Sequence, residues 1–195
     1  PVSTNKKYGY IDTAGNIIIP MDYDGAGNFS DGMGLVVRNN KCGFIDTQGK
    51  EVIPLKYDRA NSFVNGCAIV GLGGKYGLID TRGKQIVPFQ YNDMLMNNGL
   101  IQVQQNNLWG IIDKNGKLIT PIKYSEIGDF YNGIAYVRLN ERFGFIDQSG
   151  REITPIKYDE VNTIKADPFH EGLAMVRLNG VCGYIDKTGK ETIPL

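Results

Sequence analysis

Six aspartates recur at near-constant spacing and are the first candidates for chemistry in this sequence. Each stands in the pattern Gly-x-Ile-Asp-x-x-Gly. They are Asp12, Asp46, Asp80, Asp113, Asp147 and Asp186. A calcium site needs several oxygen ligands that converge on one point, whereas each copy of the pattern supplies one carboxylate. An aspartate that opens a type I turn accepts hydrogen bonds from nearby backbone amides, so the pattern predicts structural turns and no metal site.

The only histidine, His170, is the next candidate, because imidazole is the commonest general base. It lies in the segment 169–172, and the corresponding position of other repeats holds serine, valine or tyrosine. No nucleophile motif such as Gly-x-Ser-x-Gly accompanies it. The glycine-rich run 71–74 lacks the Lys-Ser/Thr ending of a phosphate-binding loop. We therefore expect a protein that is not an enzyme, with no catalytic residues and no cofactor.

The three cysteines, Cys42, Cys67 and Cys182, form no Cys-x-x-Cys pair. Their odd number gives no disulfide framework and no zinc site. Each occupies a repeat position that is apolar or aromatic in other copies. Because a free cysteine behaves as a small hydrophobe, we expect all three to fill the core.

A row of arginines at one repeat position is the main candidate for binding. Stacked repeats bring such residues to one face, beside a second row formed by Lys56, Lys123 and Lys157. One interpretation is a solvated edge whose lysines oppose aggregation. The other is a polar recognition face for a protein or a glycan, with aromatic anchors supplied by the irregular fifth repeat. The candidate interaction surface comprises Arg38, Arg138, Arg177, Tyr131, Tyr136, Ile164, Lys165, Phe169 and His170.

The repeat itself sets the elements that must position these residues. The first glycines of the six copies lie 34, 34, 33, 34 and 39 residues apart. Residues 133–166 serve as the representative repeat. In it we expect three strands at 133–138, 142–147 and 151–158, with the Asp-x-x-Gly turn joining the last two as a hairpin. A proline recurs in the third strand and places it at a sheet edge. A tyrosine three residues later, as in Tyr57, is expected to pack on the next repeat.

These units predict an all-β fold of six tandem repeats of ~34 residues, each a three-stranded antiparallel sheet. We expect an open superhelical array, and the alternative is a closed propeller-like ring. The whole chain, 1–195, is expected to be one repeat domain. Its repeats span about 1–32, 33–66, 67–99, 100–133, 134–172 and 173–195. The chain begins without methionine and stops just after a strand, so we expect a piece of a longer protein.

The composition limits the classes of partner that the protein is expected to bind. Basic and acidic residues are equal in number, at 21 each, which gives no electrostatic footprint for nucleic acid. No run of about 20 apolar residues is present, so we expect no membrane insertion.

The consensus of the repeats resembles the WG, or KWG, repeat family of bacterial proteins. Trp109-Gly110 is the literal pair, while Tyr8-Gly9 and Phe143-Gly144 keep an aromatic residue. The resemblance implies a β-rich bacterial repeat protein that is frequently exported or envelope-associated. It brings no catalytic residues with it.

Two functions follow from the sequence as hypotheses. The first is a non-catalytic scaffold that binds another protein, in a bacterial envelope or secreted assembly. The alternative is an array that binds carbohydrate or cell wall through exposed aromatic residues. Burial of the recurring tyrosines would remove the sugar-stacking platforms that the alternative requires.

Overall fold

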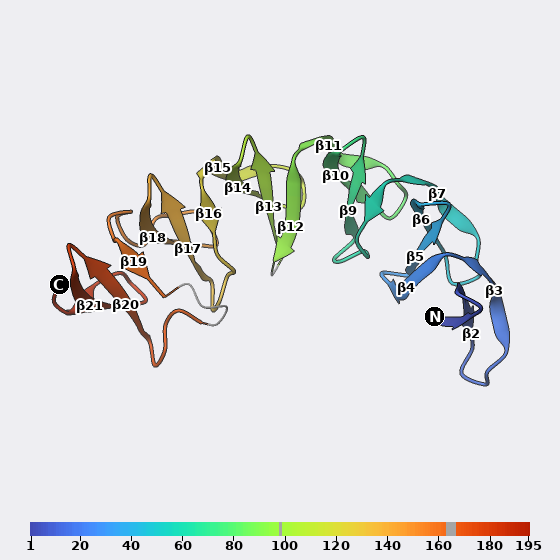
Figure 1. The fold of residues 1–195 in the computed structure, drawn as a ribbon, viewed down its shortest axis with the longest axis horizontal. Coiled ribbons are helices and arrows are strands. Elements are labelled where there is room, and N and C mark those ends of the chain that lie inside the picture. The colour runs from blue at the N-terminus through green and yellow to red at the C-terminus, as the bar shows by residue number, and fades with distance from the viewer. Residues whose placement is uncertain (98, 163–166) are drawn as a thin grey trace. The chain divides into compact units, whose positions relative to one another are not determined.

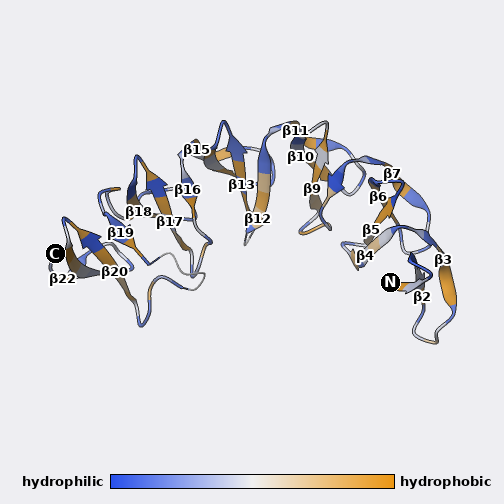
Figure 2. Ribbon diagram, in the orientation of Figure 1, coloured by the Kyte–Doolittle hydropathy of each residue, from blue (hydrophilic) through white to orange (hydrophobic). Residues whose placement is uncertain are grey.

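The computed structural model describes residues 1–97, 99–162 and 167–195, and within these ranges the regular structure is entirely β (Figure 1). In these described ranges, six antiparallel sheets follow one another. Figure 2 shows hydrophobic residues concentrated in the strands and hydrophilic residues in the turns between them. The predicted all-β repeat fold is confirmed.

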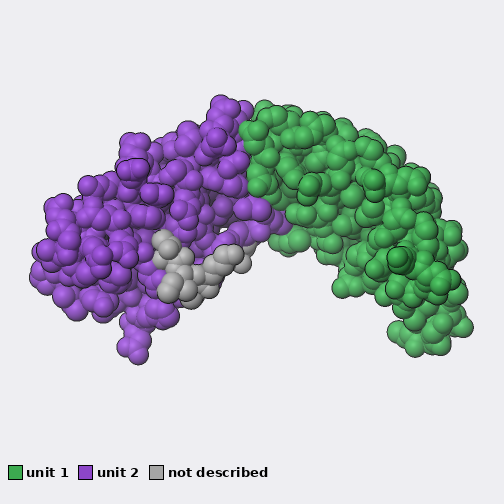
Figure 3. Space-filling view, viewed as in Figure 1, with its two compact units in different colours: residues 1–94 green, residues 95–195 purple. Residues whose placement is uncertain are grey.

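The chain forms two compact units, Pro1–Met94 and Leu95–Leu195, which Figure 3 shows in different colours. The first unit contains three complete sheets. The first sheet consists of β1 (Val2–Thr4), β2 (Lys7–Ile11) and β3 (Ile17–Tyr23), and the second of β4 (Gly25–Ser30), β5 (Met33–Arg38), β6 (Lys41–Ile45) and β7 (Glu51–Tyr57). The third sheet consists of β8 (Arg59–Ala60), β9 (Cys67–Leu72), β10 (Lys75–Asp80) and β11 (Gln85–Tyr91). The boundary between the units falls within β12 (Asp93–Asn97).

The second unit continues with the same order. Its sheets contain β12, β13 (Leu100–Gln105), β14 (Leu108–Ile112) and β15 (Leu118–Tyr124); β16 (Glu126–Ile127), β17 (Ile134–Leu139) and β18 (Arg142–Asp147); and β19 (Glu160–Val161), β20 (Leu173–Leu178), β21 (Val181–Asp186) and β22 (Glu191–Ile193).

The second sheet shows how one repeat is built. Strands β5, β6 and β7 form an antiparallel meander in which β7 lies at the outer edge. Pro54 lies in β7. Because proline cannot donate a ladder hydrogen bond, an edge strand accommodates it. The predicted three-stranded meander and the edge position of its third strand are confirmed in this sheet. The strand expected at 151–158 of the fifth repeat is wrong, because that segment forms only isolated bridges, from Glu152 to Ile146 and from Tyr158 to Phe143.

A short fourth strand is added on the other side of the meander in most sheets. Strand β4 pairs with β5, and the two-residue strand β8 pairs with β9 in the same way. These residues belong to the connection that follows the edge strand of the preceding repeat, outside the three strands expected in each unit. The connection therefore has a structural role, because it covers the free edge of the next meander.

The Asp-x-x-Gly turn has the predicted geometry. The backbone oxygen of Asp46 accepts a hydrogen bond from the amide of Gly49 across 3.0 Å, and one carboxylate oxygen accepts bonds from the amides of Gln48 and Lys50. Gly49 has a φ of 82°, which an L side chain rarely adopts. A register shift in the pairing of β6 with β7 follows at Phe44. The hairpin with its bulge is confirmed.

The recurring edge-strand tyrosines connect neighbouring repeats within each unit. Tyr57 is 2% exposed and packs in one cluster with Phe44 of its own repeat and with Phe63 and Val70 of the following one. Tyr124 and Tyr158 lie in equivalent clusters of the second unit. Neighbouring repeats thus share a core, as the repeat pattern predicts.

The glycine in the central strand allows close packing of the edge strand. A Cβ atom built on Gly43 would lie 2.7 Å from the backbone oxygen of Ile53. Any side chain there would push the two strands apart, so this position requires glycine.

The cysteines divide in a way that the sequence analysis does not anticipate. Cys42 and Cys67 are buried as expected, but Cys182 is exposed, so that prediction is wrong for Cys182. Ala60 of the following repeat packs against the cluster that contains Cys42. No described strand follows β22, so nothing equivalent covers Cys182.

Strand pairing leaves the array open. Among the described residues, β1 pairs with β2 and β22 pairs with β21, and no strand of the first sheet joins the last sheet. The termini therefore complete no shared sheet of the kind that closes a ring.

Candidate functional site

An aspartate that follows the edge-strand tyrosine ties three segments together. The carboxylate of Asp24 contacts the Lys7 ammonium across 2.6 Å and accepts a hydrogen bond from the amide of Asn39 across 2.7 Å. Lys7 begins the central strand of the same repeat, and Asn39 lies in the turn between β5 and β6 of the next. We call this arrangement the inter-repeat clamp.

The clamp recurs at two other junctions. Asp58 contacts Lys41 across 2.5 Å and accepts a hydrogen bond from the amide of Gly73. Asp159 pairs with Arg142 and accepts a hydrogen bond from the amide of Asn179. The hydrogen bond from the lysine is the main reason that the pKa values of Asp24 and Asp58 lie below the usual range. These carboxylates therefore bond to groups of two successive repeats and hold the repeats together.

The three equivalent arginines have different surroundings. The guanidinium carbon of Arg38, in the first unit, lies 4.6 Å from the centre of the Tyr23 ring. In the second unit Arg138 lies 5.4 Å from the Phe143 ring, whereas Arg177 forms an ion pair of 2.8 Å with Glu160. One repeat position thus supplies three distinct binding environments.

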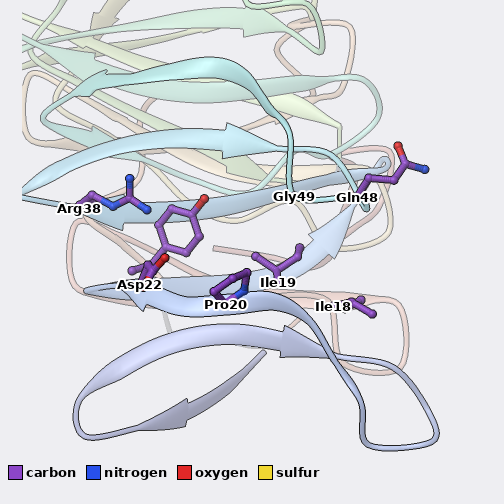
Figure 4. A pocket seen from close by; sticks show the side chains of 8 residues that line it. Ile18, Ile19, Pro20, Asp22, Arg38, Gln48 and Gly49 are labelled. Carbon is purple, nitrogen blue, oxygen red and sulfur yellow. The ribbon is translucent and has the colours of Figure 1, made fainter.

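A pocket of about 240 Å³ opens between the first and second repeats, in the first unit. Ile18, Pro20 and Asp22 of β3 line it on one side, and Arg38 of β5 and Gln48 line it on the other (Figure 4). Arg38 also lines a second pocket of about 390 Å³ that lies towards β7. Arg38 therefore stands between two open pockets with mixed apolar and charged walls.

The second unit has a corresponding pocket of about 330 Å³ between the fourth and fifth repeats. Lys123 and Ser125 line it from the end of β15, and Arg138 and Asn140 line it from β17 and the turn that follows. Leu108 forms an apolar wall. The structure thus brings Arg138 together with Lys123 of the predicted second row, and with Leu108 and Ser125, which belong to neither predicted row.

The remaining predicted surface residues are dispersed. Tyr131 is half-buried and His170 is exposed. Phe169 is 3% exposed and packs on Phe145 with ring centres 5.2 Å apart, so it is a core residue and does not act as an exposed anchor. Ile164 and Lys165 lie outside the described residues.

Tyr136 is engaged by a neighbouring strand. Its hydroxyl donates a hydrogen bond to a carboxylate oxygen of Glu126 across 2.6 Å. Burial, followed by this bond, raises the pKa of the Tyr136 phenol well above its ordinary value. The phenol therefore stays protonated and holds Glu126 in place.

Ser125 and Leu108 are site residues that sequence reasoning passed over. They replace the aspartate and the basic residue of the clamp, so their departure from the repeat pattern was a usable signal. In the part of the chain that the structure describes, no group of three acidic, histidine or cysteine side chains is arranged to hold a metal ion. That part also contains no helix with the length and apolarity needed to cross a membrane.

Comparison with solved structures finds likeness at low sequence identity. A structure of the eukaryotic initiation factor is 11% identical with a TM-score of 0.50, over 94% of this chain and 59% of the other. Kluyveromyces lactis Hsv2 is 11% identical with a TM-score of 0.44, over 84% and 61%. Virginiamycin B lyase from Staphylococcus aureus is 18% identical with a TM-score of 0.38, over 99% and 73%.

The chain thus spans about 60% of the length of the first two of these proteins. At such identities the likeness to the initiation factor concerns the fold alone. No curated protein matches the chain.

Comparison with protein families gives a more direct result. The family described as WG containing repeat matches residues 8–42, 43–76, 76–109, 109–142 and 143–182. The matches follow one another through most of the sequence, and their boundaries fall within the central strands of the successive sheets. The chain therefore belongs to the WG containing repeat family.

Proposed function

We propose that this repeat scaffold is non-catalytic and binds a protein partner in the pockets between successive repeats. One observation carries the proposal. Open pockets at the junctions are lined by recurring residues of the fold together with residues that differ between copies, such as Asp22, Gln48 and Ser125. A scaffold with such variable positions at its junctions can present a different surface at each of them.

The pocket of the first unit has the composition of a small protein interface. Ile17 and Ile18 are 60% and 48% exposed at the edge strand beside it. Asp22 and Arg38 provide opposite charges at its rim. An apolar centre with a polar rim is the usual anatomy of a surface that binds proteins.

The carbohydrate alternative loses its main support. The five recurring tyrosines are buried between strands, with exposed fractions of 8% or less. A sugar-binding platform needs an open ring face, which these residues do not offer. We therefore favour a protein partner.

Affinity capture tests the proposal. The purified chain, an Ile18→Arg variant and a control Lys84→Ala variant would be crosslinked in a bacterial envelope extract, which the family resemblance suggests as the source. We expect one protein to be enriched by the parent chain and by Lys84→Ala, and to be lost with Ile18→Arg. Recovery of glycan alone, or equal recovery of proteins by all three baits, would contradict the proposal.

A further inference from the structure

The junction between the fourth and fifth repeats lacks the side chains of the inter-repeat clamp. Ser125 stands where the clamps have Asp24, Asp58 or Asp159. Leu108 stands where they have Lys7, Lys41 or Arg142. Compared with the clamps, this junction therefore has one negative and one positive side chain fewer. The pocket of about 330 Å³ lies at this position.

The amide that the clamp uses is nevertheless kept in place. Asn140 has a φ of 49°, close to the 53° of Asn39 and the 52° of Asn179, so the turns have the same geometry. In the clamps, the amides of Asn39 and Asn179 donate to an aspartate. The Ser125 hydroxyl, in contrast, donates to the backbone oxygen of Arg138 across 3.2 Å. The Asn140 amide therefore faces a pocket in which the clamp carboxylate is missing.

Arg138 has no carboxylate as an ion-pair partner, and the reason for this is independent of the missing clamp. Glu126 pairs with Arg138 across β16 and β17 in the same register as Glu160 with Arg177 across β19 and β20. Arg177 and Glu160 form an ion pair, but Glu126 accepts the hydrogen bond of Tyr136 instead. Among the described residues, Arg138 forms no ion pair, and its Nε is buried without a hydrogen-bond partner. An unpaired guanidinium in such a place favours an anion.

The remaining charges in the pocket give no advantage to a doubly charged group. Lys123 contributes a further positive charge, part of which its ion pair of 3.3 Å with Glu152 offsets. Glu141 places a negative charge in the lining. Together with Arg138, these charges leave no excess positive charge that would favour a phosphate with two charges over a carboxylate with one.

We propose that this pocket binds the carboxylate of an aspartate or glutamate side chain from a protein partner. That carboxylate takes the place of the clamp aspartate, with the Asn140 amide and the Arg138 guanidinium as its donors. Leu108 packs against the apolar part of the incoming side chain. The inference rests on the proposed function, because it specifies what the scaffold recognises at this junction.

A capped amino acid provides a direct test. N-acetyl-aspartic acid amide would be titrated into the isotope-labelled chain while the backbone amides of Asn140 and Ser125 are followed by NMR. We expect saturable shifts at both amides, and none at matched concentrations of N-acetyl-asparagine amide. Equal shifts with both compounds, or shifts spread over all surface amides, would overturn the inference.

A substitution that supplies the missing carboxylate is the matched control. Ser125→Asp restores the clamp aspartate and should abolish the shifts, while Gln148→Glu adds the same charge at a turn outside the pocket and should retain them. In the capture experiment, Ser125→Asp should also release the partner.

The two proposals can fail separately. A partner that Ser125→Asp still captures, together with no response to the aspartate compound, would overturn the carboxylate site and leave the scaffold proposal standing. A specific response to the compound with no captured protein would support the carboxylate site and contradict the proposed function.

Discussion

The amide of Asn39 donates to the carboxylate of Asp24 across 2.7 Å, and this bond joins two successive repeats. The same carboxylate contacts Lys7, so one aspartate orders a turn, a strand start and a strand end. Copies of this arrangement at Asp58 and Asp159 show that the junction, like the hairpin, is part of the repeat.

Acid should weaken the clamps. The folded-state pKa values of Asp24 and Asp58 are lowered from 3.8, mainly by lysine hydrogen bonds. A lowered folded pKa stabilises the fold above the unfolded value, and this stability is lost as pH falls through the folded value. We expect the thermal midpoint to fall as the pH drops below about 4, with a shallower fall for Asp58→Asn. The exposed Glu51→Gln serves as control, and an Asp58→Asn profile parallel to that of the parent chain would contradict the prediction.

Glycine at position 43 should be necessary for the second sheet. A Cβ atom there would lie 2.7 Å from the Ile53 oxygen and 2.8 Å from the Leu55 nitrogen, both backbone atoms. Gly43→Ala should cost roughly 1–3 kcal/mol or more through overpacking. At Gly25 the nearest atom would be a side-chain carbon of Val37 at 3.4 Å, so Gly25→Ala should be much milder. Circular dichroism melts of the two variants make the comparison, and equal midpoints would refute the close approach.

Phe169 and His170 should behave as core and surface residues, respectively. Phe169 packs on Phe145, so Phe169→Ala should cost roughly 3–5 kcal/mol. His170 is exposed, and His170→Ala should change stability by less than about 0.5 kcal/mol. Urea unfolding followed by fluorescence measures both changes. A similar loss from the two substitutions would show that the 169–170 segment is packed differently.

Tyr136→Phe should weaken the carboxylate site from a distance. Loss of the hydroxyl releases Glu126, which faces Arg138 across the two strands and can pair with it as Glu160 pairs with Arg177. The affinity for N-acetyl-aspartic acid amide should fall roughly tenfold, the equivalent of one charge-assisted hydrogen bond. Tyr131→Phe should leave the affinity unchanged. Unchanged binding by Tyr136→Phe would mean that Glu126 does not control Arg138.

Much of the fold could be predicted because its signals are local and repeated. The Asp46 turn needs only its own carboxylate and the positive φ of Gly49, and Pro54 excludes β7 from the interior of a sheet. The short strands could not be predicted in this way. A strand of two residues such as Arg59–Ala60 is too short to show alternation, and its pairing depends on the next repeat.

The candidate site was predicted only in part. The arginine row identified Arg38 and Arg138, which do line pockets. Phe169 was misjudged as an anchor because its neighbours are irregular, although the equivalent Phe63 and Phe130 are buried. The environment of Arg138 depends on a hydrogen bond between two other side chains, and no spacing in the sequence reveals it.

The missing clamp also bears on how the repeats communicate. In a linear repeat protein, stability is the sum of terms for each repeat and for each contact between neighbours. Ser125 and Leu108 stand in place of the clamp aspartate and its basic partner. They therefore remove one polar contribution from the contact between the fourth and fifth repeats. A carboxylate that enters this junction would restore that contribution. Binding of a carboxylate in this pocket would then make the melting of the fourth and fifth repeats sharper and more cooperative, without any change in their folded shape.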